Sequence, residues 1–177
     1  MDSDFSQPRA LSHDDFFRLL PSEGNSTDNR DSLKSYTHLY ATCVTEACFW
    51  ALVFLDNHET HDLVSNGRSL RAAAKRALEM NDAELSENWN LATVKATFNE
   101  RSDTSKWGPI FLRPATPGER PHGRWYIQDG SHRCLAYAMH ILKNNCSYIP
   151  LFAHVASNSP IEDHHASQKT QMKERKP

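Results

Sequence analysis

Hydrophobic and polar positions alternate along several short segments of this chain, and each predicts a β-strand. Segment 38–44, HLYATCV, has the alternation and the β-branched content of a strand. Segment 109–114, PIFLRP, is a short apolar run between prolines, and 124–128, RWYIQ, follows it after a turn-rich stretch. These two segments predict a β-hairpin. Segment 147–155, SYIPLFAHV, predicts a closing strand.

Between these strands the apolar residues recur with a helical period. Thr45 is a favourable N-cap for a helix over 46–57, EACFWALVFLDN, and Ser69 for a helix over 70–80, LRAAAKRALEM. One face of the second helix carries Leu70, Ala73, Ala74, Ala77 and Leu78. The loop between the two helices closes at Gly67, and a further helix is predicted over 82–101.

The last predicted helix, 132–145, lies between the strand at 124–128 and the closing strand at 147–155. Its inner face carries Leu135, Ala138, Met139 and Leu142. A strand, a helix and a second strand in this order form a βαβ-like unit. The predicted fold class is therefore α/β or α+β, a small mixed β-sheet with flanking helices.

Polar segments lie at both ends of the chain, before and after the predicted strands and helices. Residues 1–35 are rich in Ser, Asp, Asn and Pro, and 157–177 have no periodic apolar face, so both predict disordered tails. The first tail contains one apolar cluster, DDFFRLLP (14–21), which reads as a single helical turn or a docking motif. The predicted folded domain is 36–156. A hydrophobic share of 38% and a mean hydropathy of -0.67 agree with one core and unstructured flanks.

Charge and cysteine content narrow the function classes. The net charge is -2 with ten His neutral and the pI is about 6.5, so DNA binding is possible but not indicated. The four cysteines form no CxxC pair and no zinc spacing, and Cys43 and Cys48 are expected to be buried free thiols. No secretory signal is apparent, and the longest apolar run, 47–55, is too short for a membrane span. A cytoplasmic protein in a reducing compartment is expected.

The candidate site is the polar segment DGSHR, residues 129–133, between the second hairpin strand and the last helix. Gly130 permits a sharp turn, and Ser131 is a favourable N-cap residue. A helix N-terminus with Arg133 and His132 beside it would suit a phosphate, and Asp129 could hold a metal ion or accept a proton. The alternative is structural: an Asp-Gly turn, a capping serine and a decorated first helical turn.

Residues 109–155 resemble the core of the ParB/sulfiredoxin-like superfamily. The matching pieces are Pro109–Arg113, Tyr126–Arg133, the helix from His132, and Tyr148–Val155, in the family's order and spacing. The resemblance implies a compact domain that binds ATP or another nucleoside triphosphate with Mg²⁺. It implies phosphate contacts from Gly130, Ser131, His132 and Arg133, a metal contact from Asp129, and catalytic roles for Asp129, His132 and Arg133.

Differences from the family pattern reduce the number of family activities that can be expected of this chain. Sulfiredoxins place a catalytic cysteine where this chain has Ser131, and Cys134 comes too late, so sulfinic acid reduction is not expected. Partition proteins carry two arginines where this chain has Arg133 alone. Free-serine kinases of the superfamily add an upstream glutamate, and both Glu46 and Glu59 are candidates.

Three functions therefore remain open. The first is nucleotide hydrolysis or phosphoryl transfer at the DGSHR turn. The second is a non-catalytic regulatory module, such as a plasmid fertility-inhibition or partition-type accessory protein, which contacts a partner protein through its tails. The third is a nuclease, for which a more basic surface would be expected.

Other polar and aromatic residues offer weaker candidates. His58 and His61 could ligate a metal if they lay on a helix, although 56–62 also reads as a solvated loop. Segment 162–165, EDHH, suggests only adventitious metal binding. The tryptophans Trp50, Trp107 and Trp125 indicate packing rather than base stacking. Arg113 and Arg124, on neighbouring strands, indicate ordinary surface charge or a positive strip toward a nucleotide.

Overall fold

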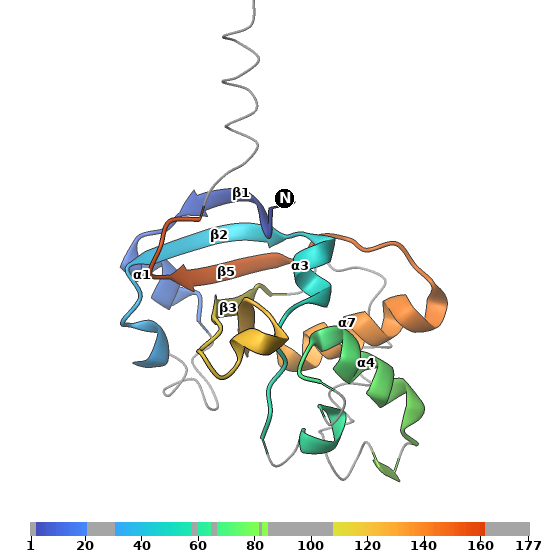
Figure 1. Cartoon of the computed structure of the whole chain (residues 1–177). Coiled ribbons are helices and arrows are strands. Elements are labelled where there is room, and N and C mark those ends of the chain that lie inside the picture. Colours follow the sequence, from blue (N-terminus) through green and yellow to red (C-terminus); the bar gives the residue numbers. More distant parts are fainter. Residues whose placement is uncertain are drawn as a thin grey trace, which may run out of the picture.

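A five-stranded mixed sheet forms the centre of the molecule (Figure 1). The computed structural model describes residues 3–20, 31–57, 60–64, 67–81, 83–84 and 108–161 of the chain. The strand order is β1-β2-β5-β3-β4, with β3 parallel to β5 and the other neighbours antiparallel. The strands are β1 (Phe5–Ala10), β2 (His38–Val44), β3 (Ile110–Pro114), β4 (Trp125–Asp129) and β5 (Phe152–Ser157). This sheet confirms the predicted small α+β fold.

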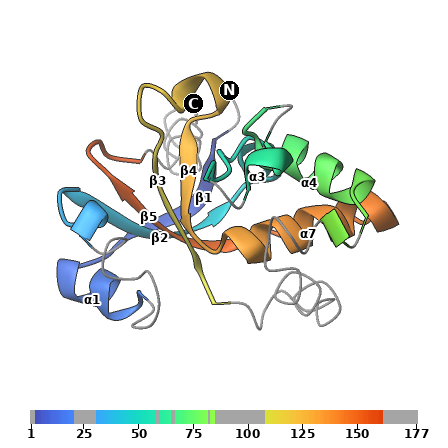
Figure 2. The ribbon, with the colours of Figure 1, turned by 90° about the horizontal axis from the view of Figure 1, so that it is seen from below.

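Helices flank the sheet, and α4 and α7 lie side by side (Figure 2). They include α1 (His13–Arg18), α3 (Glu46–Trp50), α4 (Leu70–Glu79) and α7 (Ser131–Asn144), with 3₁₀ turns at His61–Leu63 and Arg120–His122. Thr45 and Ser69 cap α3 and α4 as predicted, through hydrogen bonds to Cys48 N and Ala72 N. No described helix has the length and apolar character that crossing a bilayer requires.

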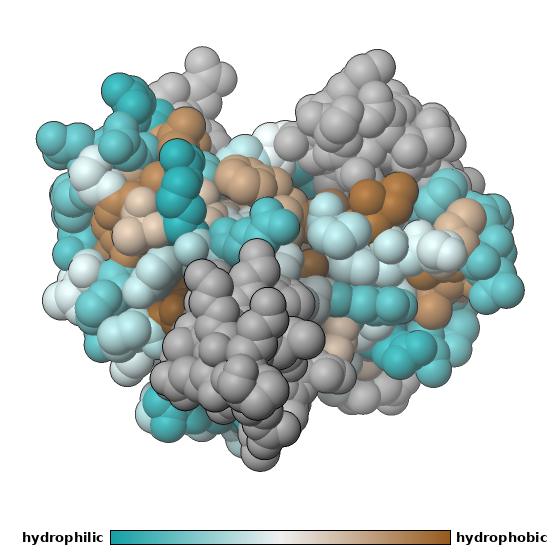
Figure 3. All heavy atoms as spheres, turned by 90° about the horizontal axis from the view of Figure 1, so that it is seen from above, coloured by the Kyte–Doolittle hydropathy of each residue, from teal (hydrophilic) through white to brown (hydrophobic). Residues whose placement is uncertain are grey.

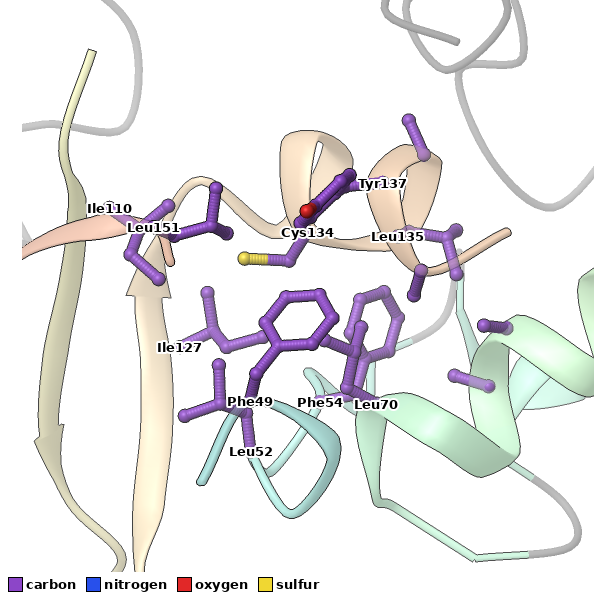
Figure 4. Close-up of a cluster of buried hydrophobic side chains, with 14 of the residues drawn as sticks. Phe49, Leu52, Phe54, Leu70, Ile110, Ile127, Cys134, Leu135, Tyr137 and Leu151 are labelled. Carbon is purple, nitrogen blue, oxygen red and sulfur yellow. The ribbon is translucent and has the colours of Figure 1, made fainter. Parts of the chain in front are cut away.

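The larger hydrophobic cluster lies between one face of the sheet and α3, α4 and α7. Because side chains alternate along a strand, Ile110 and Leu112 of β3 join it while Phe111 points to the opposite face. Figure 4 shows Cys134 of α7 pointing into this cluster, with its sulfur on the side of Leu151 and Ile127. Leu135, Ala138 and Met139 of α7 are buried as predicted.

The smaller cluster covers the other face of the sheet and includes the N-terminal segment. Phe16 and Phe17 of α1 pack there with Leu39 and Phe111, and the Phe16 and Phe111 rings meet edge to face at 5.7 Å. β1 pairs antiparallel with β2 and places Phe5 opposite Val44.

The prediction that residues 1–35 form a disordered tail is therefore wrong for 3–20 and 31–35. The apolar residues of this segment are few, but they cover a sheet face built by strands far along the chain. Composition alone does not reveal such a contact. Within the two predicted tails, residues 1–2, 21–30 and 162–177 lie outside the described residues.

Two helix predictions differ from the structure, and a third is not tested by it. α3 ends at Trp50 rather than Asn57, because the following residues extend the sheet edge: Val53 N donates to Trp125 O at 2.7 Å, and Ile127 N donates to Val53 O. Leu78 of α4 is exposed. The predicted helix at 82–101 lies almost entirely outside the described residues.

The closing strand β5 starts at Phe152, whereas 147–155 was predicted. Before it, Leu151 O still accepts from Val44 N of β2 at 2.9 Å, but tyrosine hydroxyls accept from the backbone N–H groups: Ile149 N donates to Tyr137 Oη at 2.6 Å, and Leu151 N to Tyr148 Oη at 3.2 Å.

Candidate functional site

The candidate site is the turn from β4 into α7, residues 129–133. Gly130 has φ 93° and ψ 17°, in the left-handed region that favours glycine. A Cβ atom at this position would lie 2.8 Å from Ile110 Cγ2, closer than a real contact allows. The predicted requirement for glycine at this turn is confirmed, and it has two causes: the backbone conformation and the close packing against β3.

Gly130, not Ser131, is the N-cap of α7. Ser131 is the first helical residue, and Cys134 N donates to Gly130 O at 2.9 Å. As a glycine, this N-cap residue makes no side-chain cap hydrogen bond. The prediction of a Ser131 cap is wrong by one position, because the sharp turn at Gly130 starts the helix one residue early. The N-cap residue of α7 therefore has no side-chain acceptor of the kind that caps α3 and α4.

Arg133 joins three segments of the chain at this turn. Its Nη2 lies 3.0 Å from Asp129 Oδ2, and its Nη1 donates to the carbonyl oxygen of Gly108. The side chains of Arg133 and Asp129 are 21% and 31% exposed. A Cβ on Gly108 would lie 3.2 Å from Arg133 Nη1, so a larger residue there would require the guanidinium to shift by a few tenths of an ångström. Arg133 therefore forms an ion pair within the turn and stabilises the fold. This agrees in part with the alternative interpretation of DGSHR as a purely structural turn.

The remaining predicted site residues lie at the same turn. Asp129 is the last residue of β4, opposite Phe111 across the hairpin, and a register irregularity lies between Phe111 and Leu112. Ser131 and His132 are half-buried in the first turn of α7. The structure therefore brings all five predicted residues together, as their contiguity in sequence required.

A metal ion at this turn would have few protein ligands. Among the described residues no group of three or more His, Cys, Asp and Glu side chains is placed to hold a metal.

The other acidic and histidine candidates do not add a ligand at the turn. Glu46 lies in the first turn of α3, where its Oε1 is 3.4 Å from Trp50 Nε1, and Glu59 lies outside the described residues. His61 Nδ1 lies 3.4 Å from Asp56 Oδ1, and its proposed partner His58 is also outside them.

Arg113 and Arg124 do not form a positive strip. Arg113 donates to both carboxylate oxygens of Glu119, at 2.8 and 3.0 Å, and its guanidinium lies 3.9 Å from the centre of the Tyr126 ring. Burial acts to raise the pKa of Glu119, but hydrogen bonds from Arg113 and from Thr116 hold that pKa at about 2. Arg124 lies 3.5 Å from Asp4. Over the coloured residues of Figure 3, hydrophobic side chains are interspersed among hydrophilic ones.

The tryptophans that the structure describes take part in packing, as predicted. Trp125 Nε1 donates to Asp4 Oδ2 at 3.0 Å, and its ring meets Phe5 at 4.8 Å. Trp50 packs at the edge of the larger cluster under Arg71. Trp107 lies outside the described residues.

His154 is a buried polar residue that sequence reasoning missed. It is 2% exposed, and its Nδ1 has no hydrogen-bond partner among the described residues. Phe111 and Phe16 pack against its ring at 5.0 and 5.9 Å. Burial, and to a lesser degree the charge of Arg9, lower its pKa to about 4. A histidine in an alternating strand carries no sequence signal for this environment, because the residues that cover it come from α1 and β3.

Comparison of the chain with protein-family models, with curated proteins and with solved structures finds no match.

Proposed function

We propose that residues 129–133 bind the phosphate groups of ATP or another nucleoside triphosphate, and that the protein hydrolyses it or transfers its phosphoryl group. The proposal rests on one arrangement at the start of α7. A turn that requires glycine leads from the end of β4 into this 14-residue helix, whose N-cap residue has no side chain to cap it, and the Arg133 guanidinium lies in its first turn. Free N–H groups and the positive end of the helix dipole attract anions, and phosphates bind at such helix starts.

The resemblance to the ParB/sulfiredoxin-like superfamily supports the same ligand. That resemblance predicts two strands, a helix that starts close to Ser131, and a third strand in one sheet. β3, β4, α7 and β5 have this order. The proposal that the chain shares the family's ligand rests on this order together with the DGSHR segment.

Magnesium would fit this turn in one way only. Mg²⁺ at phosphate sites commonly takes one or two carboxylates, with the remaining ligands from phosphate and water. Asp129 is the carboxylate available at the turn. Bound there with a nucleotide, the ion would neutralise phosphate charge. The residues of the chain would place the phosphates: the first N–H groups of α7 would donate to their oxygens, and Arg133 would form a charge-assisted hydrogen bond.

The ion pair between Asp129 and Arg133 has a consequence for this ligand. A phosphate that engages Arg133 competes with the Asp129 carboxylate, and a free phosphate would leave that carboxylate beside a second anion. A cation on Asp129 removes the conflict, because each member of the pair then has a new partner of opposite charge. The proposed site should therefore favour a metal-bound nucleotide over the free nucleotide.

A regulatory binding module is the second candidate. The observation that favours it is the use of Arg133 as a link between Asp129 and Gly108, since a guanidinium held in this way stabilises the fold without any ligand. Such a module would act on a partner protein in the cytoplasm. The nuclease reading has less support, since Arg113 and Arg124 are each paired with a carboxylate.

A thermal-shift screen with ATP, CTP, GTP and ADP, each with and without magnesium, tests the proposal. A ligand that binds the native state alone raises the melting temperature by mass action. We expect at least one nucleotide to do so, with a larger shift when magnesium is present. The control variant is Arg71→Ala, which removes an arginine from the first turn of α4. It should show the same nucleotide-induced shift in melting temperature as the wild type. If no nucleotide shifts the wild-type protein, the regulatory module becomes the better account.

A further inference from the structure

The far end of α7 carries a second group of reactive side chains. Cys146 Sγ lies 3.8 Å from His140 Nε2, and Asn144 Nδ2 lies 3.1 Å from His140 Nδ1. The backbone fixes Cys146 at this point: Asn145 ends the helix in the left-handed conformation, and Cys146 N donates to Ile141 O at 3.2 Å. A nucleophile, an imidazole within hydrogen-bond reach and a third group that orients the imidazole are the elements of an activated nucleophile.

The orientation of the Asn144 amide determines which imidazole nitrogen faces the sulfur as a donor. Asn144 Nδ2 also donates to the backbone carbonyl of His140 at 3.1 Å, and a carbonyl oxygen can only accept. The NH₂ group of Asn144 therefore faces His140, so Nδ1 of the neutral ring is the acceptor. Nε2 then carries the ring hydrogen and donates it toward Cys146 Sγ. This donor would hold a thiolate formed at that sulfur.

The other three cysteines lie in different environments. Cys48 and Cys134 are buried in the larger hydrophobic cluster, where burial raises the pKa of both thiols, that of Cys134 to about 12. Cys43 is half-buried in β2, while Cys146 is exposed. Thiol–disulfide exchange requires a thiolate that a disulfide can reach, so these environments separate Cys146 from the rest.

We propose that Cys146 is a nucleophilic thiol, assisted by His140, that small disulfides modify by thiol–disulfide exchange. The thiol proton goes to solvent, and the thiolate attacks one sulfur of the disulfide. A new bond forms between Cys146 Sγ and that sulfur, the original S–S bond breaks, and the other sulfur leaves as a thiolate. One disulfide is consumed and one is formed, so no further oxidant is needed.

This site is separate from the DGSHR turn. α7 has 14 residues, and at about 1.5 Å rise per residue its two ends lie roughly 20 Å apart. The turn lies at the start of the helix, and Cys146 follows Asn145, the residue that ends it. The proposal therefore does not depend on nucleotide binding, and either can fail while the other holds.

The test uses the full chain with glutathione disulfide as the probe. Intact mass spectrometry counts the adducts over time, and peptide mapping locates them. We expect the first adduct on Cys146. Cys146→Ser should abolish this first phase, and the matched control Cys43→Ser should retain it. Formation of the first adduct on Cys43, or an equal rate in Cys146→Ser, would overturn the proposal.

A second pair of variants tests the role of His140. His140→Ala should slow the first adduct about two- to fivefold, the range expected for an exposed charge-assisted pair. His140→Gln offers a side-chain N–H in place of Nε2 and should restore part of the rate. Melting temperatures of both variants check that the fold is kept. An unchanged rate in His140→Ala would show that Cys146 reacts through exposure alone and would refute the assistance by His140.

Discussion

Gly130 supplies the sharpest test of how the turn is built, and the perturbation is Gly130→Ala. The φ of 93° lies in a region that costs an L-residue about 1–2 kcal/mol. The added Cβ would also lie 2.8 Å from Ile110 Cγ2 and 3.0 Å from Arg133 Nη2. Ile110 is fully buried in the sheet and cannot move freely, and overpacking of this kind costs about 1–3 kcal/mol. Together these effects predict a loss of about 2–5 kcal/mol in the free energy of unfolding.

Urea unfolding, followed by tryptophan fluorescence, measures this loss. The matched control is Gly118→Ala in the hairpin turn, where a Cβ would meet nothing within 4 Å. This control should change the free energy of unfolding by less than about 1 kcal/mol, since such substitutions act through the unfolded chain. If Gly130→Ala is as stable as Gly118→Ala, the turn is not held in the conformation described, and the reasoning about the helix start fails.

Further predictions concern Glu119, His154 and Phe16. Glu119→Gln should destabilise the protein by about 3 kcal/mol in chemical unfolding, because it leaves the Arg113 guanidinium without its counter-charge. In the wild type, the low pKa of Glu119 gives stability that is present above pH 4.5 and lost as the pH falls toward 2. The lowered pKa of His154 affects a higher pH range: its contribution to the free energy of unfolding is present above pH 6.5 and is lost as the pH falls to about 4. His154→Phe should therefore remove the pH dependence of the free energy of unfolding in that range only. Phe16→Ala should cost about 3–5 kcal/mol in chemical unfolding, and equal stability would return residues 3–20 to the status of a dispensable tail.

Local patterns in the sequence predicted the elements around the site well. The β3–β4 hairpin, the glycine turn and α7 depend on residues that are neighbours in the chain, so alternation, a turn signal and a helical period were sufficient. Thr45 and Ser69 were found as caps for the same reason. The end of α3 was missed, because the apolar run after it pairs with β4, a strand about 70 residues further along the chain.

Contacts between distant segments account for the remaining errors. The N-terminal residues read as disordered because their partners, β2 and Phe111, are remote in sequence. The pairing of Arg133 with Asp129 is four residues apart and could have been anticipated. Its contact with Gly108 was missed although the predicted hairpin favours it, because antiparallel pairing of β3 and β4 places the start of β3 beside the end of β4. The substitution Arg133→Ala removes both of these fold contacts and should lower the melting temperature.

Calorimetric titration of nucleotide into the wild type, Arg133→Ala and Asp129→Asn, with and without magnesium, tests the central claim most directly. Arg133→Ala should weaken magnesium-bound nucleotide on the order of tenfold, the value of one hydrogen bond to a charged group. Asp129→Asn keeps the turn but removes the competing charge, so it should bind free nucleotide more tightly than the wild type and lose the magnesium dependence. Unchanged affinity in Arg133→Ala, with a lowered melting temperature, would contradict the claim and leave DGSHR as a structural turn.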